Sequence, residues 1–75
     1  MICLKIKEMA AEKRVSLSKL SRRADVDPSH LRKMYRAPCS VNITLETLNR
    51  LAWALGCDAC ELIEYTADGP RAYDE

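Results

Sequence analysis

One stretch, SLSKLSRRADVDPSHLRKMYR, contains two short helical patterns separated by a turn of two or three residues, and it constrains the fold more than any other feature. Ser16 and Asp27 can both cap a helix, because their side-chain oxygens accept amide protons that a first helical turn leaves unpaired. Pro28 favours a helix start, since its fixed φ suits the first helical position. The sequence therefore predicts helices over residues 17–24 and 28–36.

The second of these helices divides its side chains into two faces. Leu31, Met34 and Tyr35 recur at helical spacing and form an inward apolar stripe. The outer face is shared by Ser29, Arg32, Lys33 and Arg36, and Pro28 lies at the N-terminal end of the same helix. A helix that carries such a face, and that is held at an angle to a preceding helix, fits the major groove of DNA.

This stretch resembles the helix-turn-helix of the lambda-repressor-like family, the Cro/repressor (XRE-like) type, and especially its short single-domain members. Leu20 and Ser21 lie where the family has its "Leu-Ala" pair, Val26 at the buried position after the turn, and Leu31 at the buried position of the recognition helix. The resemblance covers roughly residues 5–65. It implies an all-α, five-helix DNA-binding domain and a role as a sequence-specific transcriptional regulator, most often a repressor.

The chain departs from the family pattern at two positions. Family members usually have Gln at the start of the first motif helix, where this chain has Leu17. They usually have Gly in the turn, where this chain has Asp25. An aspartate can adopt the left-handed conformation that such a turn needs, at some energetic cost.

Outside this helix-turn-helix stretch, the spacing of apolar residues and the capping residues predict the other helices and strands. Residues 2–4 alternate like a strand, and a helical period follows over residues 5–14. Thr44 caps a fourth helix, which Gly56 ends; its expected core positions are Leu45, Leu48, Leu51, Ala52 and Leu55. Asp58 and Glu61 form a capping-box pattern for a fifth helix. Because LIEYT (62–66) also has strand propensity, it could pair with residues 2–4 and join the two ends of the chain.

Length and composition indicate one small globular unit. At 75 residues and 48% hydrophobic content, the chain is expected to form a single domain over residues 1–66 and a flexible tail over 67–75. There is no apolar run long enough for a membrane span, and charges interrupt the start of the chain, unlike a signal peptide. These features favour a cytoplasmic protein without membrane association.

The net charge of +1 conceals an uneven distribution. Residues 1–36 hold ten Lys or Arg against four acidic residues, a balance of +6, whereas residues 37–75 hold two against seven, a balance of −5. Charged helix surfaces are often merely solvated, but such asymmetry favours one basic face for phosphate and one acidic face kept away from it.

Within the helix-turn-helix, residue chemistry suggests individual roles at the DNA. Arg32 can donate two hydrogen bonds to guanine, Ser29 suits several bases, and Pro28 can contact a thymine methyl group. The expected phosphate contacts come from Arg22, Arg23, Lys33 and Arg36, and from the free amides near Ser16 and Leu17. His30 is expected on the helix surface near the DNA backbone.

The four cysteines raise a zinc alternative. Cys57 and Cys60 form a CxxC motif, and Cys39 with Cys3 or His30 could complete a tetrahedral site. A single CxxC is a weak signal, however, and Cys57 falls at a position where the family has a buried apolar residue, so a reduced, buried thiol is the preferred interpretation. No metal or cofactor is therefore predicted. With one histidine and no phosphate-binding loop, the sequence also does not suggest an enzyme.

Two functions follow from these features. The first is a regulator that binds double-stranded operator DNA as a homodimer, with the dimer interface in the C-terminal half. The second is an antitoxin-like or adaptor module whose acidic half contacts a partner protein. Trp53 is expected at the edge of the fourth helix, either as a lid on the core or as an interface anchor.

Overall fold

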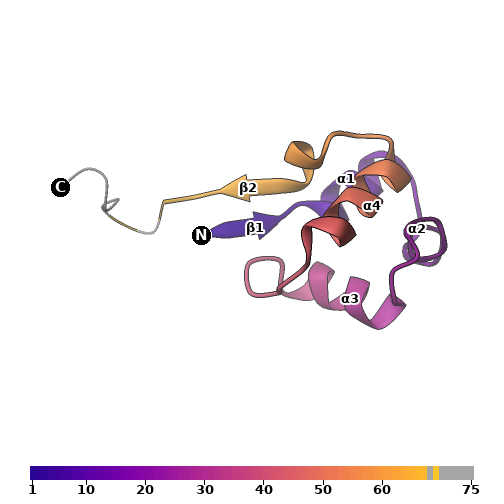
Figure 1. Ribbon diagram of the computed structural model, residues 1–75, viewed down its shortest axis with the longest axis horizontal. Coiled ribbons are helices and arrows are strands. Elements are labelled where there is room, and N and C mark those ends of the chain that lie inside the picture. Colours follow the sequence, from indigo (N-terminus) through magenta and orange to yellow (C-terminus); the bar gives the residue numbers. More distant parts are fainter. Residues whose placement is uncertain (68, 70–75) are drawn as a thin grey trace.

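Among the residues that the structure describes, the fold consists of four α-helices and a small two-stranded antiparallel sheet (Figure 1). The computed structural model describes residues 1–67 and 69. The elements in chain order are β1 (Ile2–Leu4), α1 (Ile6–Glu12), α2 (Leu17–Ala24), α3 (Pro28–Arg36), α4 (Leu45–Leu55), the 3-10 helix η1 (Ala59–Leu62) and β2 (Ile63–Tyr65). The predicted flexible tail, residues 67–75, lies almost entirely outside the described residues.

Both motif helices begin and end as predicted, because local capping fixes their boundaries. The Ser16 hydroxyl accepts the amide proton of Lys19 at 3.2 Å, and the Asp27 carboxylate accepts that of Ser29 at 2.7 Å. Asp25 adopts the left-handed conformation with φ 55°, as expected for a residue that replaces the usual glycine. The two-helix unit is thus specified by residues close to one another in sequence.

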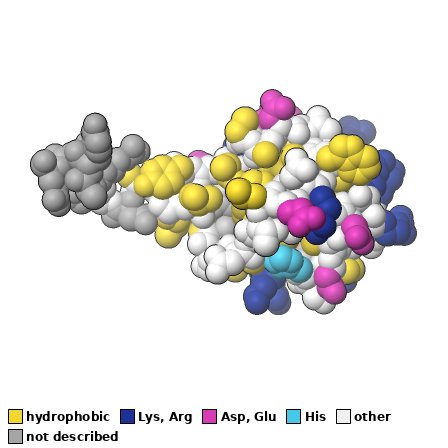
Figure 2. All heavy atoms as spheres, viewed as in Figure 1, with side chains coloured by type: hydrophobic (Ala, Val, Ile, Leu, Met, Phe, Trp, Pro, Cys, Tyr) yellow, Lys and Arg dark blue, Asp and Glu magenta, His cyan; other side chains and the backbone are white. Residues whose placement is uncertain are grey.

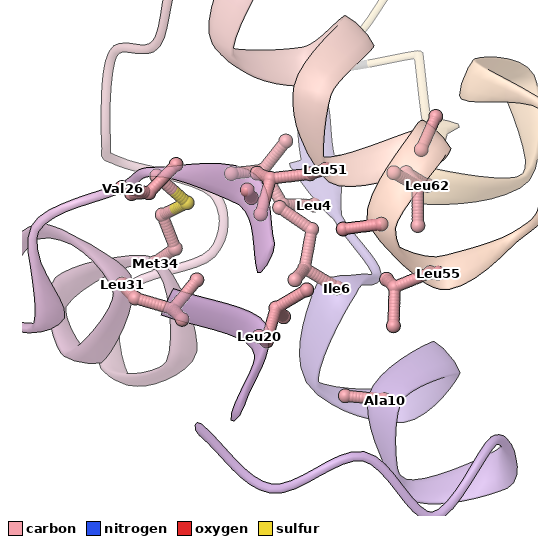
Figure 3. Close-up of a cluster of buried hydrophobic side chains, with 13 residues drawn as sticks. Leu4, Ile6, Ala10, Leu20, Val26, Leu31, Met34, Leu51, Leu55 and Leu62 are labelled. Carbon is pink, nitrogen blue, oxygen red and sulfur yellow. The ribbon is translucent and has the colours of Figure 1, made fainter. Parts of the chain in front are cut away.

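One hydrophobic core joins all four helices and the sheet (Figure 3). Its largest fully buried side chains come from every part of the chain: Ile6, Leu20, Leu31, Met34, Leu51 and Leu62. Each large aliphatic side chain removed from water contributes roughly 1.5–3 kcal/mol to folding. In a chain this short, the orientation of α3 therefore depends on its contacts with α1 and α2.

The predicted pairing of the two chain ends is confirmed. β1 and β2 are antiparallel, with Ile2 opposite Tyr65 and Leu4 opposite Ile63. The amide of Lys5 extends the contact by donating to the carbonyl of Leu62 at 2.7 Å. The sheet extends from the side of the helical bundle away from α2 (Figure 1).

Two predictions are wrong: the segment after Gly56 does not form a fifth α-helix, and the first helix is shorter than expected. The segment after Asp58 makes only the single 3-10 turn η1 and then becomes β2. The Glu61 carboxylate accepts the Asp58 amide proton at 2.9 Å, so the capping signal is used, but pairing with β1 requires extended backbone immediately afterwards. Helix α1 ends at Glu12 rather than residue 14, because Arg14 adopts a positive φ of 57°.

Leu45 was predicted in the core and is instead 83% exposed. The buried face of α4 includes Thr47 and Ala54 as well as Leu51, Ala52 and Leu55. At about 100° per residue, this face is centred roughly 100° away from Leu45 around the helix axis. Trp53 is 75% exposed, which contradicts the lid interpretation.

A disulfide bond joins Cys3 in β1 to Cys39 in the loop between α3 and α4. The sequence pattern did not predict this pair, because the two cysteines are 36 residues apart and no local signal connects them. The adjacent residues are also joined, since the amide of Leu4 donates to the carbonyl of Pro38 at 2.9 Å. The end of α3 is therefore connected to the sheet.

Candidate nucleic-acid interface

The outer face of α3 is the centre of the candidate interface. Its five predicted site residues are all exposed: Pro28, Ser29, Arg32, Lys33 and Arg36. On an ideal helix these side chains fall within an arc of about 140°. Leu31 and Met34 on the opposite side are 0% and 1% exposed and fix the rotation of the helix about its axis. The structure therefore brings the predicted contact residues of α3 together on one surface.

The turn before α3 is held by buried hydrogen bonds that sequence reasoning missed. The Ser21 hydroxyl donates to the carbonyl of Val26, while the Val26 amide donates to the carbonyl of Ser21 at 3.1 Å. Ser21 is only 8% exposed. A serine at the small-residue position of the family's "Leu-Ala" pair was the available signal. These bonds set the angle between α2 and α3, and with it the direction in which the outer face of α3 points.

Helix α2 contributes a second group of exposed cations. Arg22 and Arg23 are exposed, as predicted, and Lys19 lies on the same side of the helix. Lys19 was not among the predicted contacts, although its spacing of three and four residues from the two arginines indicates a shared face. Figure 2 shows Lys and Arg side chains over α2 and along the lower edge of the molecule, where α3 lies.

The N-terminus of α2 agrees only partly with expectation. Ser16 is exposed, but its hydroxyl already accepts the Lys19 amide proton. Leu17 is half-buried and packs against the core, so its side chain belongs to the fold, and only its backbone amide remains suited to a phosphate. His30 is half-buried on α3 beside the exposed face.

The cationic side chains of this surface form no ion pair with any residue that the structure describes. Within the described part of the chain, Arg22, Arg23, Arg32, Lys33 and Arg36 have no carboxylate within 4.0 Å, while Arg50 and Glu46 on α4 form an ion pair at 3.4 Å. Charges that lack internal partners keep their full attraction for a polyanion. The surface is thus electrostatically suited to a phosphate backbone.

Tyr35 lies on the opposite, partly buried side of α3. Burial, followed by the negative charge of Glu8, raises the pKa of its phenol. Its hydroxyl is buried without a hydrogen-bond partner among the described residues. Tyr35 therefore supports the packing of α3 rather than belonging to the outer surface.

The cysteines do not form a metal-binding cluster in the described part of the chain. Cys3 and Cys39 are bonded to each other, whereas Cys57 and Cys60 are free thiols. Across residues 1–67, no three His, Cys, Asp or Glu side chains approach closely enough to hold a metal ion. Cys57 is half-buried against the core, and burial, with a further contribution from Glu61, raises the pKa of its thiol.

A family model for the Cro/C1-type HTH DNA-binding domain matches residues 5–68, most of the chain. The chain belongs to this Cro/C1-type family. Membership identifies α2 and α3 as its helix-turn-helix and the chain as a DNA-binding regulator domain. A search of curated proteins finds no match. None of the helices over the described residues has the length and apolar character needed to cross a membrane.

Proposed function

We propose that this Cro/C1-type chain is a sequence-specific transcriptional repressor that acts in the cytoplasm as a homodimer, with α3 in the major groove of its operator. The observation that carries the proposal is the exposed outer face of α3, whose cations have no carboxylate within 4.0 Å among the described residues, opposite the buried Leu31 and Met34. Repression is the simplest outcome of such binding, because occupancy of a promoter blocks transcription without a further contact surface.

Arg32 is the proposed base-reading residue. It lies within the first turns of α3, where recognition helices approach base edges, and its guanidinium can bond guanine O6 and N7 together. Ser29 and Pro28 occupy the same end of α3 and suit a second base and a thymine methyl group. These three residues would set the sequence preference.

The other cations are proposed phosphate contacts. Lys33 and Arg36 extend along α3, and Arg22 and Arg23 project from α2, so together they can contact the DNA backbone beside the groove. The Leu17 amide at the start of α2 adds a neutral donor. Contacts of this kind hold the recognition helix in place without selecting a sequence.

The first test substitutes base-reading and phosphate-binding residues separately. Arg32→Ala should weaken binding to the best duplex from a random-DNA selection by about 1–3 kcal/mol and relax preference at one base pair. Lys33→Ala should weaken all duplexes more evenly and lower the salt dependence by about one ion. Fluorescence anisotropy across a salt series measures both effects, and circular dichroism confirms folding. Wild-type affinity and preference in the Arg32 variant would contradict its proposed role.

The homodimer is proposed to form through the outer face of α4. Leu45 and Trp53 are 83% and 75% exposed, and with Asn49 they fall in one row at spacings of four residues. Large apolar side chains exposed in one row are typical of interfaces. A palindromic operator requires two recognition helices about 34 Å apart, which a pair of these chains can supply.

The dimer is tested with Trp53→Ala. If Trp53 anchors the interface, its loss should raise the dimer dissociation constant about 30-fold, as expected for an interface hot spot near 2 kcal/mol. The unfolding temperature of the monomer should change little, because the indole lies outside the core. Sedimentation equilibrium gives the constant, with the exposed α1 variant Glu12→Ala as control. A wild-type chain that stays monomeric both free and on DNA would exclude the dimer.

A further inference from the structure

The Cys3–Cys39 disulfide lies close to the C-terminal end of α3. The bond between Cys3 and Cys39 closes a ring that contains α1, α2 and α3, and therefore the whole helix-turn-helix. Cys39 is exposed and Cys3 is half-buried. Cys39 is therefore the member of the pair that small reagents in solution would approach first.

We propose that Cys3 and Cys39 form a reversible oxidation site that controls the affinity of the domain for DNA. This inference rests on the proposed function, which places the chain beside DNA in the reducing cytoplasm. Disulfides rarely persist there, and those that form are usually transient, catalytic or redox-sensing. A bond next to the recognition helix fits the sensing class, because making or breaking it changes how the end of that helix is held.

The oxidant in this step is a low-molecular-weight disulfide, R–S–S–R. The Cys39 thiolate attacks one of its sulfurs, which forms a mixed disulfide and releases one RS⁻. The Cys3 thiolate then attacks the Cys39 sulfur, forming the internal bond and releasing the second RS⁻. The two cysteines lose two protons and two electrons in total, and the small disulfide becomes two thiols, RSH. Excess RSH reverses both steps.

The bond acts on DNA binding through the end of α3. Arg36 is the last residue of α3, and the Ala37 amide closes the helix by donating to the carbonyl of Lys33 at 2.9 Å. Cys39 lies two residues after Ala37, in the loop that leads to α4. This loop has no regular structure between residues 41 and 44. In the oxidised chain, the disulfide and the Leu4–Pro38 hydrogen bond hold this exit against β1. In the reduced chain, the covalent restraint is lost.

A groove beside the disulfide indicates how the loop moves when the bond opens. It has a volume of about 370 Å³ and lies between β1, the 38–44 loop and the start of α4. Val41 and Ile43 are only half-buried along it. Because the loop does not fill the space beneath it, reduction allows the loop and the last turn of α3 to fluctuate. Binding to DNA must then order Arg36 and its surroundings, which lowers affinity.

The test measures DNA affinity as a function of the thiol state of the full chain. Wild-type protein is equilibrated with oxidised or reduced glutathione, its thiol content is verified by alkylation and mass spectrometry, and its affinity for the selected duplex is measured by anisotropy. The oxidised chain should bind about threefold to tenfold more tightly, corresponding to the ordering of one or two side chains and their loop. Cys3→Ser/Cys39→Ser should bind like reduced wild type in both buffers.

Matched controls separate this site from the other thiols and from the proposed function. Cys57→Ser/Cys60→Ser should retain the full difference between buffers. If Cys3→Ser/Cys39→Ser does not fold, reduced wild type supplies the same comparison. Equal affinity in the two wild-type states, or a bond that glutathione cannot open in the folded chain, would overturn the switch alone. Absence of DNA binding in both states, with the bond forming reversibly, would overturn the DNA-reading function and its regulation together.

Discussion

The helix-turn-helix and the terminal sheet are stabilised in different ways. Helices α2 and α3 are defined by their own caps and by the Ser21–Val26 hydrogen bonds, and each buries fully inaccessible side chains in the core. The sheet has strands of three residues each, joins chain ends far apart in sequence, and is attached to the loop after α3 by one disulfide. Local signals specify the first region, whereas long-range contacts specify the second. The two regions should therefore respond to different perturbations.

The largest effect is expected from a cavity beneath α3. Leu31→Ala should lower the free energy of unfolding by about 2–5 kcal/mol, because Leu31 is 0% exposed and the surrounding core cannot fully collapse. The same substitution at Leu45, which is 83% exposed in the single chain, should cost less than about 0.5 kcal/mol when unfolding is measured at concentrations too low for dimer formation. Urea unfolding followed by circular dichroism compares them. Similar losses at both positions would mean that α3 is not held by the core in the way described.

The next effect concerns the disulfide. Reduction should lower the free energy of unfolding by about 2–4 kcal/mol, because the ring that it closes restricts the unfolded chain. Urea unfolding with and without reductant measures the loss, and Cys57→Ser/Cys60→Ser should show an equal one. Most of the native helical signal should persist in the reduced chain, since the Ser16 and Asp27 caps and the buried Leu20 and Leu31 do not depend on the bond. Loss of that signal on reduction would show that the two regions are not separable.

The smallest effect is expected at Tyr35. Tyr35→Phe should leave stability unchanged or raise it by up to about 1 kcal/mol at neutral pH, because it removes a buried hydroxyl that has no hydrogen-bond partner among the described residues. The raised pKa means that the folded chain retains the phenol proton at a pH where the unfolded chain loses it. Wild-type stability should therefore fall as pH rises above about 10, and the Phe variant should fall less. Parallel alkaline profiles for the two proteins would contradict this assignment.

The two regions also differ in how far the sequence predicted them. Capping by Ser16 and Asp27, and the glycine stop after α4, located three helices at their observed boundaries. The helical period of residues 28–36 also predicted which side chains of α3 face outward. The pairing of residues 2–4 with 63–65 was foreseen as an option, because both segments have strand propensity. Signals that act within a few residues were therefore sufficient for most of the candidate site.

The errors arose where distant contacts override local preference. A capping box after Gly56 predicted a helix, but pairing with β1 limits that segment to the single turn η1. Leu45 has a core-like side chain, yet its angle around α4 places it in solvent. The Cys3–Cys39 bond depends on the approach of β1 to the loop after α3, which no periodicity encodes. The buried Ser21 hydroxyl likewise depends on the turn conformation.

The contact between Met1 and Thr66 has a consequence for building larger proteins. The terminal amine of Met1 donates to the carbonyl of Thr66 at 2.6 Å, so the chain enters and leaves the folded unit at nearly one point. That point lies at the end of the sheet, away from α2 and α3 (Figure 1). A unit with adjacent entrance and exit can be inserted into a surface loop of a host protein with short linkers. Such an insertion would display the DNA-facing helices outward and leave the host chain nearly uninterrupted.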